Sequence, residues 1–241
     1  MDLVTLDRMP EMSGVLKELN DSTWPEFLLR ADIRSWSSIY TGFQSFQILV
    51  LEHNALVGAG LTVPFEWVPG DPLPSTIDEM VYSAHWPLKT AGVLCALGVL
   101  VRPMYRRRGI SRKILSEMRS LSTAKGLRGV LAPVRPNRKH EFAEDSIEAY
   151  AQRRDEKGRL LDPWLRVHEE MGGERLGFMH NSLTVTASIQ DWEKWTGMRF
   201  STSGSYCIPD GLAPITIDLE ENLGTYREPN VWYFHRSRLQ N

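Results

Sequence analysis

Basic residues gather in a short turn that contains one glycine. Three consecutive arginines, 106–108, precede Gly109, and Ser111 follows two residues later. An amphipathic helical pattern begins directly after this glycine, so the first N–H groups of the helix have no intrahelical partners. Those donors, the positive end of the helix dipole and the arginine charges suit an anion such as a pyrophosphate. The spacing is too tight for a P-loop and lacks the three glycines of the dinucleotide fingerprint.

The turn is predicted to lie between a buried strand and a helix. Residues 93–101 are nearly all apolar, which is typical of a strand covered on both faces. Apolar residues at helical spacing then run from residue 110 to a glycine at 126, a residue that favours helix C-termini. A second buried strand is predicted at 130–134. Pro133 cannot donate a ladder hydrogen bond there, so one side of that strand should be unpaired.

The other elements alternate in type along the chain. The expected elements are a strand at 3–6, helix from 12 to 31 broken at Trp24-Pro25, a hairpin of 44–52 and 55–67, a short helix at 77–83, a helix at 162–171, a strand at 175–186, a short helix around 192–195, and strands at 213–219 and 231–235. This mixed order predicts an α/β (α+β) sandwich around one mixed sheet.

The pattern Val101-x-Pro103-x-Tyr105-Arg106-x-x-Gly109-Ile110-Ser111 resembles the coenzyme A pyrophosphate loop of the GNAT N-acetyltransferase superfamily. The family pattern is Arg/Gln-x-x-Gly-x-Gly/Ala after an apolar strand, and the serine departs from it while remaining small. The strand 130–134 with Asn137 resembles the family's second motif, and the helix ending at 168–172 resembles its Tyr-x-x-Leu-Gly helix. The resemblance covers roughly residues 1–185. It implies a mostly antiparallel sheet, flanked by helices, whose middle strands splay apart around the pantetheine arm.

The resemblance implies an acyl-CoA-dependent N-acyltransferase. Such an enzyme moves an acetyl or other short acyl group from acyl-CoA, its co-substrate, to a small primary amine by direct attack. The residues expected to bind acyl-CoA are Val99, Leu100, Val101, Arg106, Arg107, Arg108, Gly109, Ile110, Ser111, Arg112 and Asn137.

Catalytic candidates also follow from the resemblance. Transfer needs a neutral amine, a donor to the developing oxyanion and a proton for the leaving thiolate. His168 matches the position of the family's proton-donating tyrosine, and Tyr150 is a second candidate. A core histidine is the structural alternative for the first. Family members use a carboxylate as base near the second to fourth strands. The candidates in that stretch are Glu79, Glu66, Asp78 and His85.

Composition argues against several other classes. The net charge of −2 gives no bulk attraction to nucleic acid or to a membrane. Two distant cysteines and no histidine pair at ligand spacing predict neither a disulfide framework nor a metal site. The N-terminal residues lack the apolar core of a signal peptide. The longest apolar run, 91–101, is about half of the roughly 20 residues that cross a bilayer, so a cytoplasmic protein is expected.

We expect a catalytic domain over residues 1–185 and a C-terminal extension over 186–241 that packs on it. Aromatic residues of the extension suit either a core or an acceptor pocket. The basic segment 135–140 is expected to be a solvated loop, or to meet the 3′-phosphate of CoA or an acidic acceptor. A catalytically silent CoA-binding or regulatory protein and a longer-chain acyltransferase remain as alternatives. The sequence reveals neither the amine acceptor nor whether the protein is a homodimer.

Overall fold

The structure, a computed structural model, describes residues 1–237 and groups the chain into two units. Unit 1 consists of Met1–Trp24, Ile33–Ala132 and the segment from Phe234, and unit 2 of Pro25–Asp32 and Pro133–Tyr233. Strands β5 (Gly129–Val134) and β9 (Leu223–Arg236) each run through both units. The predicted functional boundary at residue 185 lies inside β6 (Glu174–Ala187), and that division stays a prediction.

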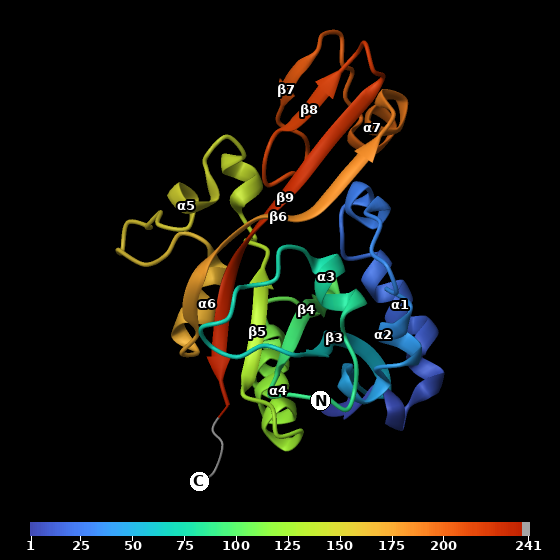
Figure 1. Ribbon diagram of the computed structural model, residues 1–241, viewed down its shortest axis with the longest axis vertical. Helices are drawn as coiled ribbons and strands as arrows, with labels where there is room; N and C mark the ends of the chain where they lie inside the picture. Colours follow the sequence, from blue (N-terminus) through green and yellow to red (C-terminus); the bar gives the residue numbers. More distant parts are fainter. Residues whose placement is uncertain (238–241) are drawn as a thin grey trace. The chain divides into compact units, whose positions relative to one another are not determined.

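The sheet of unit 1 has the strand order β1-β2-β3-β4-β5, with β9 next to β5 (Figure 1). Its first strands are β1 (Asp2–Thr5), β2 (Ile48–Glu52), β3 (Ala55–Phe65) and β4 (Val93–Val101). These four pair antiparallel, whereas β5 runs parallel to β4. The hairpin turns at His53 and Asn54, whose φ values of 51° and 64° suit a two-residue turn. The predicted mixed, mostly antiparallel sheet is confirmed.

Strand β4 separates from β5 after a short stretch of pairing. Leu94 pairs with Val130 and Cys95 pairs with Leu131. Within the described chain, residues 96–101 of β4 have no partner on β5. The predicted splay of the middle strands therefore begins immediately after Cys95.

A β-bulge in β4 coincides with this separation. Thr62 of β3 faces Ala96, but the next β3 residue, Leu61, faces Gly98. Leu97 is therefore the extra residue of the bulge. A bulge bends its strand and increases the local twist, which is why β4 turns away from its neighbour here.

Helix α4 (Ile110–Ala124) covers one face of this sheet (Figure 1). Ile110 and Ile114 are buried against β3 and β4 at the predicted helical spacing. Two glycines of β3 make the close approach possible. A Cβ on Gly58 would lie 3.0 Å from Cγ2 of Ile110, and one on Gly60 would lie 2.7 Å from Cγ2 of Ile114. The helix is therefore seated closely on the sheet, and so is the turn from which it starts.

Three shorter helices complete unit 1: α1 (Ser13–Asp21), α2 (Ser38–Thr41) and α3 (Ile77–Tyr82). The expected break at Trp24-Pro25 is present, because a separate 3-10 helix, Glu26–Arg30, follows the proline in unit 2. Helix α2 was not predicted. Its four residues are too few to show a helical period.

In unit 2, β9 pairs with β8 and with β6, and β8 pairs with β7. The further elements are α5 (Ile147–Tyr150), α6 (Pro163–Glu170), α7 (Ile189–Thr196), β7 (Gly204–Tyr206) and β8 (Ile215–Asp218). The core is aromatic: the ring of Phe27 lies 5.6 Å from that of Trp192 and 5.1 Å from that of Tyr226. Trp232 and Tyr233 are also buried. Among the described residues, no helix has the length and apolarity to cross a membrane.

The stability of unit 1 is expected to fall at mildly acidic pH because of His235. Its side chain is fully buried, and burial, with the charge of Arg119, lowers its pKa to about 4. The unfolded value is about 6.5, so the unfolded chain binds more protons between these two pH values. Stability should therefore be complete above about pH 6.5, and about 3 kcal/mol should be lost by pH 4.

Urea unfolding of the wild type and of His235→Phe at several pH values between 7 and 4 checks this expectation. The phenylalanine variant keeps an aromatic ring but cannot take up a proton. Its free energy of unfolding should fall less steeply between pH 6.5 and 4.5. Equal slopes for the two proteins would contradict the role of His235.

Candidate functional site

The turn between β4 and α4 brings the predicted anion-binding residues together in unit 1. A 3-10 helix, Pro103–Tyr105, follows β4, and α4 begins after Gly109. Arg107 and Gly109 have left-handed backbone conformations, with φ values of 63° and 73°. Apart from its own chain neighbours, no described atom lies within 4 Å of a Cβ built on Gly109. The space beside this glycine is therefore open.

The N-cap residue of helix α4 is Gly109, which has no side chain to accept hydrogen bonds from the first N–H groups of the helix. Four other helices are capped by a hydroxyl or a carboxylate, from Thr76, Ser146, Asp162 and Ser188. The 15 residues of α4 provide a helix dipole and unshared N–H donors at the turn. These donors fit an anionic group such as a pyrophosphate.

The arginines of the turn have different surroundings. Nη2 of Arg108 lies 2.7 Å from Oε1 of Glu52, and its guanidinium lies over the ring of Tyr105. The hydrogen bond from this arginine lowers the pKa of the Glu52 carboxyl. Arg108 is exposed, as are Arg106 and Arg107 in the turn and Arg112 in the first turn of α4. Arg108 thus ties the turn to the end of β2, a contact that the sequence did not predict.

The free edge of β4 leads away from this turn. Val99 and Val101 are half-exposed, whereas Leu100 between them is buried. Because β5 has separated from this part of β4, an extended amide-bearing arm can pair with it as a strand would. The chemistry of the edge therefore fits pantetheine, as the open turn fits the pyrophosphate.

The predicted site residues fall in both units. The turn, the β4 edge and Glu79 belong to unit 1, and Asn137, Tyr150 and His168 belong to unit 2. Asn137 is exposed, three residues past the end of β5.

His168 lies in the core of unit 2. Its side chain on α6 is 2% exposed, and its ring centroid lies 4.6 Å from that of Trp164 and 5.1 Å from that of Tyr233. Its carbonyl accepts a hydrogen bond from the N–H of Gly173, where the helix ends. This packing matches the core-histidine alternative, and the catalytic role stays a prediction.

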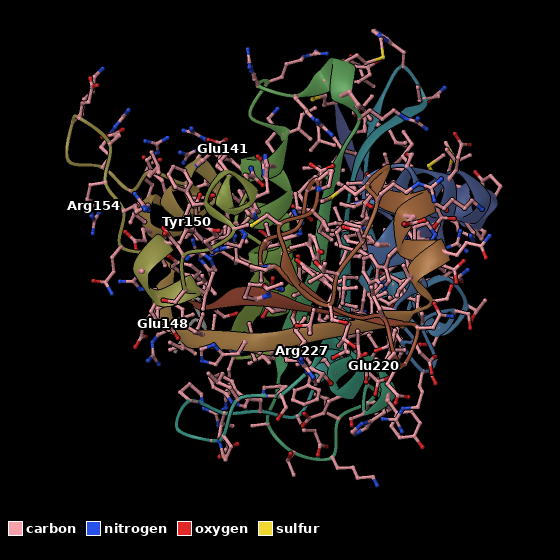
Figure 2. All side chains as sticks on the ribbon, turned by 90° about the horizontal axis from the view of Figure 1, so that it is seen from above. Glu141, Glu148, Tyr150, Arg154, Glu220 and Arg227 are labelled. Carbon is pink, nitrogen blue, oxygen red and sulfur yellow. The ribbon has the colours of Figure 1, made fainter. Side chains whose placement is uncertain are left out.

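Tyr150 and Glu79 both make local structural contacts. The hydroxyl of Tyr150, on α5 (Figure 2), donates to Asp162 at 2.9 Å, and burial raises its pKa. The carboxylate of Glu79 accepts from the N–H of Ser75 at 2.7 Å, and its own N–H donates to Thr76 Oγ1 at 3.1 Å. These two bonds cap the start of α3 in the manner of a capping box, except that the carboxylate accepts from Ser75, the residue before the N-cap Thr76. Neither contact tests the predicted catalytic roles.

The remaining base candidates also have partners. Glu66 accepts from the N–H of Lys89 at 2.7 Å and lies 3.1 Å from His85 Nε2. The Lys89 bond is the main cause of the lowered pKa of Glu66, which keeps this carboxylate ionised. Asp78 is paired with Arg34 at 2.7 Å. Within residues 1–237, no group of three or more histidine, cysteine or acidic residues could hold a metal ion.

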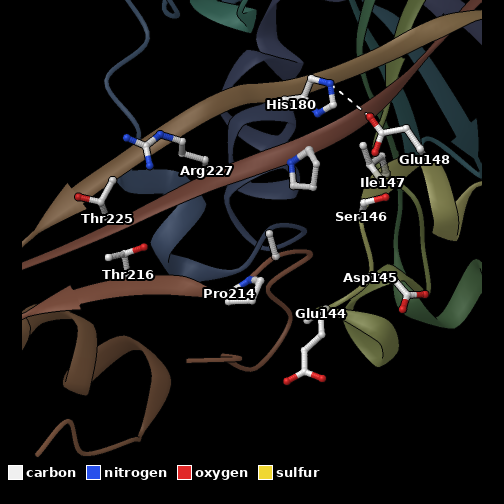
Figure 3. Close-up of a pocket in the computed structure, with 13 residues that line it drawn as sticks. Glu144, Asp145, Ser146, Ile147, Glu148, His180, Pro214, Thr216, Thr225 and Arg227 are labelled. Carbon is white, nitrogen blue, oxygen red and sulfur yellow. Dashed lines mark ion pairs between the residues drawn. The ribbon is translucent and has the colours of Figure 1, made fainter. Parts of the chain in front are cut away.

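Unit 2 contains a pocket of about 350 Å³ (Figure 3). Glu144 and Glu148 line it, and His180 lies 3.3 Å from Glu148. Arg227 and Pro214 belong to the same lining. Across the described chain, none of the predicted site residues lines this pocket.

Lys139 holds one wall of this pocket in place. Its side chain is fully buried, and Nζ donates to the carbonyl oxygens of Phe142, Asp145 and Leu212, each at 2.8 Å. Burial lowers the pKa of this amine. The expectation of a solvated loop over 135–140 is wrong for this residue, because backbone carbonyls replace water around its charge.

The chain was compared with family models, with curated proteins and with solved structures. No family model matches the chain. Among curated proteins, the arginine N-acetyltransferase avaD of Aspergillus versicolor is 29% identical over 248 residues, covering 89% of this chain and 85% of that protein. Among solved structures, the loading GNATL domain of CurA from Lyngbya majuscula has a TM-score of 0.64 at 16% identity, covering 98% of this chain and 96% of that chain.

The chain has the fold of GNAT proteins. A second GNAT structure, the GNAT-like decarboxylase GphF in complex with isobutyryl-CoA, has a TM-score of 0.63 at 16% identity and covers 98% of this chain. The two structures confirm the predicted GNAT fold. The turn at 106–109 is the segment whose sequence resembles the pyrophosphate loop of that superfamily.

Proposed function

We propose that this protein is a member of the GNAT superfamily and an acyl-CoA-dependent N-acyltransferase that moves an acetyl or other short acyl group onto an amine. The observation that carries the proposal is the uncapped start of α4, set in an open turn next to the free edge of β4. This geometry supports acyl-CoA binding. The arginine N-acetyltransferase relative supports transfer to nitrogen.

Direct transfer matches the groups that this chain offers. The amine nitrogen attacks the thioester carbonyl, a C–N bond forms and the C–S bond breaks. The nitrogen gives up one proton to a base, for which Glu79 is the proposed candidate, and the thiolate takes up one proton from the acid and leaves as the free thiol. The N–H groups along Val99–Val101 are the proposed donors to pantetheine and to the carbonyl oxygen. Among the turn residues, Arg106, Arg107 and Arg112 are proposed to contact the phosphates through charge-assisted hydrogen bonds.

For the acceptor, we propose an amino acid or amine of the arginine type. The support is the relative avaD, an arginine N-acetyltransferase, which aligns with this chain over 85% of its own length. Other small amines remain the comparison set for the assay.

We propose that His168 is the acid that protonates the leaving thiolate. Because its side chain is buried, a substitution must separate this role from a role in packing. His168→Phe preserves an aromatic ring between Trp164 and Tyr233 but cannot donate a proton. If His168 protonates the thiolate, turnover should fall by about 100-fold with an unchanged affinity for acetyl-CoA, the usual range for a general acid. Steady-state rates and equilibrium binding provide the two readouts. A folded variant with wild-type turnover would remove His168 from the mechanism.

Thermal unfolding with acyl-CoA ligands tests the binding step. Acetyl-CoA at 100 times its dissociation constant should add about 2.7 kcal/mol of stability, because only the folded state binds it. An RNA oligonucleotide serves as the control for unspecific binding to the arginines. No shift with any CoA species would contradict the proposal.

Release of free thiol tests the transfer step. Acetyl-CoA is incubated with arginine and with a panel of other amines, and the acylated product is identified by mass spectrometry. We expect thiol release that depends on the amine, and most with arginine-type acceptors. Tight CoA binding with no thiol release for any amine would instead favour a catalytically silent CoA-binding protein.

A further inference from the structure

The indole of Trp24 closes one face of the sheet beside the free edge of β4. A Cβ on Gly98 would lie 3.3 Å from Cζ2 of Trp24, 3.6 Å from Leu100 Cδ2 and 3.9 Å from Leu61 Cδ1. Gly98 is the first residue after the bulge at Leu97. The two leucines are buried, whereas Trp24 and Gly98 are half-exposed. The ring therefore borders accessible space at the point where β4 has left β5.

Hydrogen bonds hold this indole in a defined position. Nε1 of Trp24 donates to Oδ1 of Asn20 at 3.1 Å. The amide of Asn20 is 3% exposed and donates in turn to Oδ1 of Asp21 at 3.2 Å. A ring anchored through its nitrogen cannot swing aside without leaving a buried amide oxygen unpaired. The indole of Trp24 is therefore held in one position beside Gly98.

The opposite face of the same strand is already filled by α4. Val99 faces Gly60 in the register, and a Cβ there would lie 2.7 Å from Ile114 and 2.8 Å from Met118. Both helix side chains are fully buried. Helix α4 thus packs closely on one face of the strand, and the half-exposed Trp24 borders the other face.

The positions of the turn and of the bulge on β4 determine in which direction a bound pantetheine arm would run. The turn at Gly109 follows the last residues of the strand, so an arm attached there runs back along the free edge toward the bulge. Its thioester then lies near Gly98, and the acyl carbons meet the indole. We propose that Trp24 is a specificity-determining residue that limits the length of the acyl group. This inference rests on the proposed acyl-CoA binding.

Chain-length profiles test the proposal. Affinities for acetyl-, butyryl-, hexanoyl- and octanoyl-CoA are measured on the full chain for the wild type, Trp24→Ala and Trp24→Leu. Each newly accommodated methylene group is worth about a fourfold change in affinity. In Trp24→Ala, the affinity for octanoyl-CoA relative to acetyl-CoA should therefore rise at least about tenfold. Trp24→Leu, which keeps an apolar side chain, should show a smaller rise in the same direction.

Two further variants sharpen the result. Gly98→Ala adds a methyl group against the indole and should weaken butyryl-CoA binding more than acetyl-CoA binding. Trp195→Ala removes a half-buried tryptophan of unit 2, which contacts Trp192, and should leave the profile unchanged. Thermal unfolding confirms that each variant is folded, and Trp24→Leu replaces Trp24→Ala if that variant is not.

The outcomes separate this inference from the proposed function. A wild type that binds acyl-CoA, with the same chain-length profile in folded Trp24→Ala and Trp24→Leu, would overturn the role of Trp24 alone. A wild type that binds no acyl-CoA would overturn both. If the chain-length profile shifted as much in the Trp195→Ala control as in Trp24→Ala, the result would also contradict a specific effect of Trp24 on acyl length.

Discussion

Gly109→Asp is expected to lower the affinity for acetyl-CoA by about 100-fold or more and to leave the fold intact. An aspartate at this N-cap position can accept hydrogen bonds from the first N–H groups of α4, the donors proposed for the pyrophosphate. Its charge also repels the phosphates. Hydrogen bonds to charged groups contribute about 1.5–3 kcal/mol each, so losing them accounts for the expected 100-fold, or about 2.8 kcal/mol. Equilibrium binding of acetyl-CoA measures the effect.

The same helix supplies a matched control at its other end. Gly126 has φ 69°, close to the 73° of Gly109, and no described atom lies within 4 Å of a Cβ at either position. Gly126→Asp therefore carries a similar backbone strain but places its carboxylate far from the start of the helix. It should bind acetyl-CoA as the wild type does. Equal losses in the two variants would show that strain, and not competition for the donors, weakens binding.

Glu228→Gln is expected to destabilise the protein by about 3–5 kcal/mol. Glu228 is 1% exposed and is paired with Arg135, and it accepts a hydrogen bond from the hydroxyl of Tyr226. Nη2 of the same arginine donates to the carbonyl oxygen of Asp210 at 2.6 Å. Removing one charge of this pair leaves the other charge without a partner. The free energy lost in this way is larger than the free energy that the intact pair contributes to stability. Urea unfolding measures the loss.

A double variant and a surface pair separate charge burial from packing. Arg135→Met combined with Glu228→Leu removes both charges, and it should recover much of the lost stability. Glu141→Gln, in the exposed ion pair with Arg138, should cost at most about 1 kcal/mol. If Glu228→Gln cost no more than Glu141→Gln, the buried network of unit 2 would have no special role in stability.

Sequence reasoning was most successful where structure depends on neighbouring residues. The apolar run 93–101, the helical spacing after Gly109 and the turn at His53-Asn54 all form the predicted elements. Asp162 caps α6 as expected, accepting from two helix N–H groups. Periodicity, turn conformation and capping are local properties, so a single sequence contains them.

Several features of the site depend on residues that are far apart in the sequence. Arg108 pairs with Glu52, 56 positions away, and Lys139 reaches the carbonyl of Leu212, 73 positions away. A basic residue in a polar segment has the same sequence signature whether water or a folded backbone surrounds it. Only the tertiary structure distinguished the buried lysine from its solvated neighbours.

The sequence by itself determined the family resemblance, the order of strand, turn and helix around Gly109 and the segment that offers donors to an anion. The tertiary structure decided which of those groups are available: it placed Arg108 against Glu52 and His168 between two aromatic rings. It also set Trp24 against Gly98, which no sequence pattern indicated. The physical reason is that donors and periodicity are local, whereas burial and contact across a sheet depend on how distant segments pack.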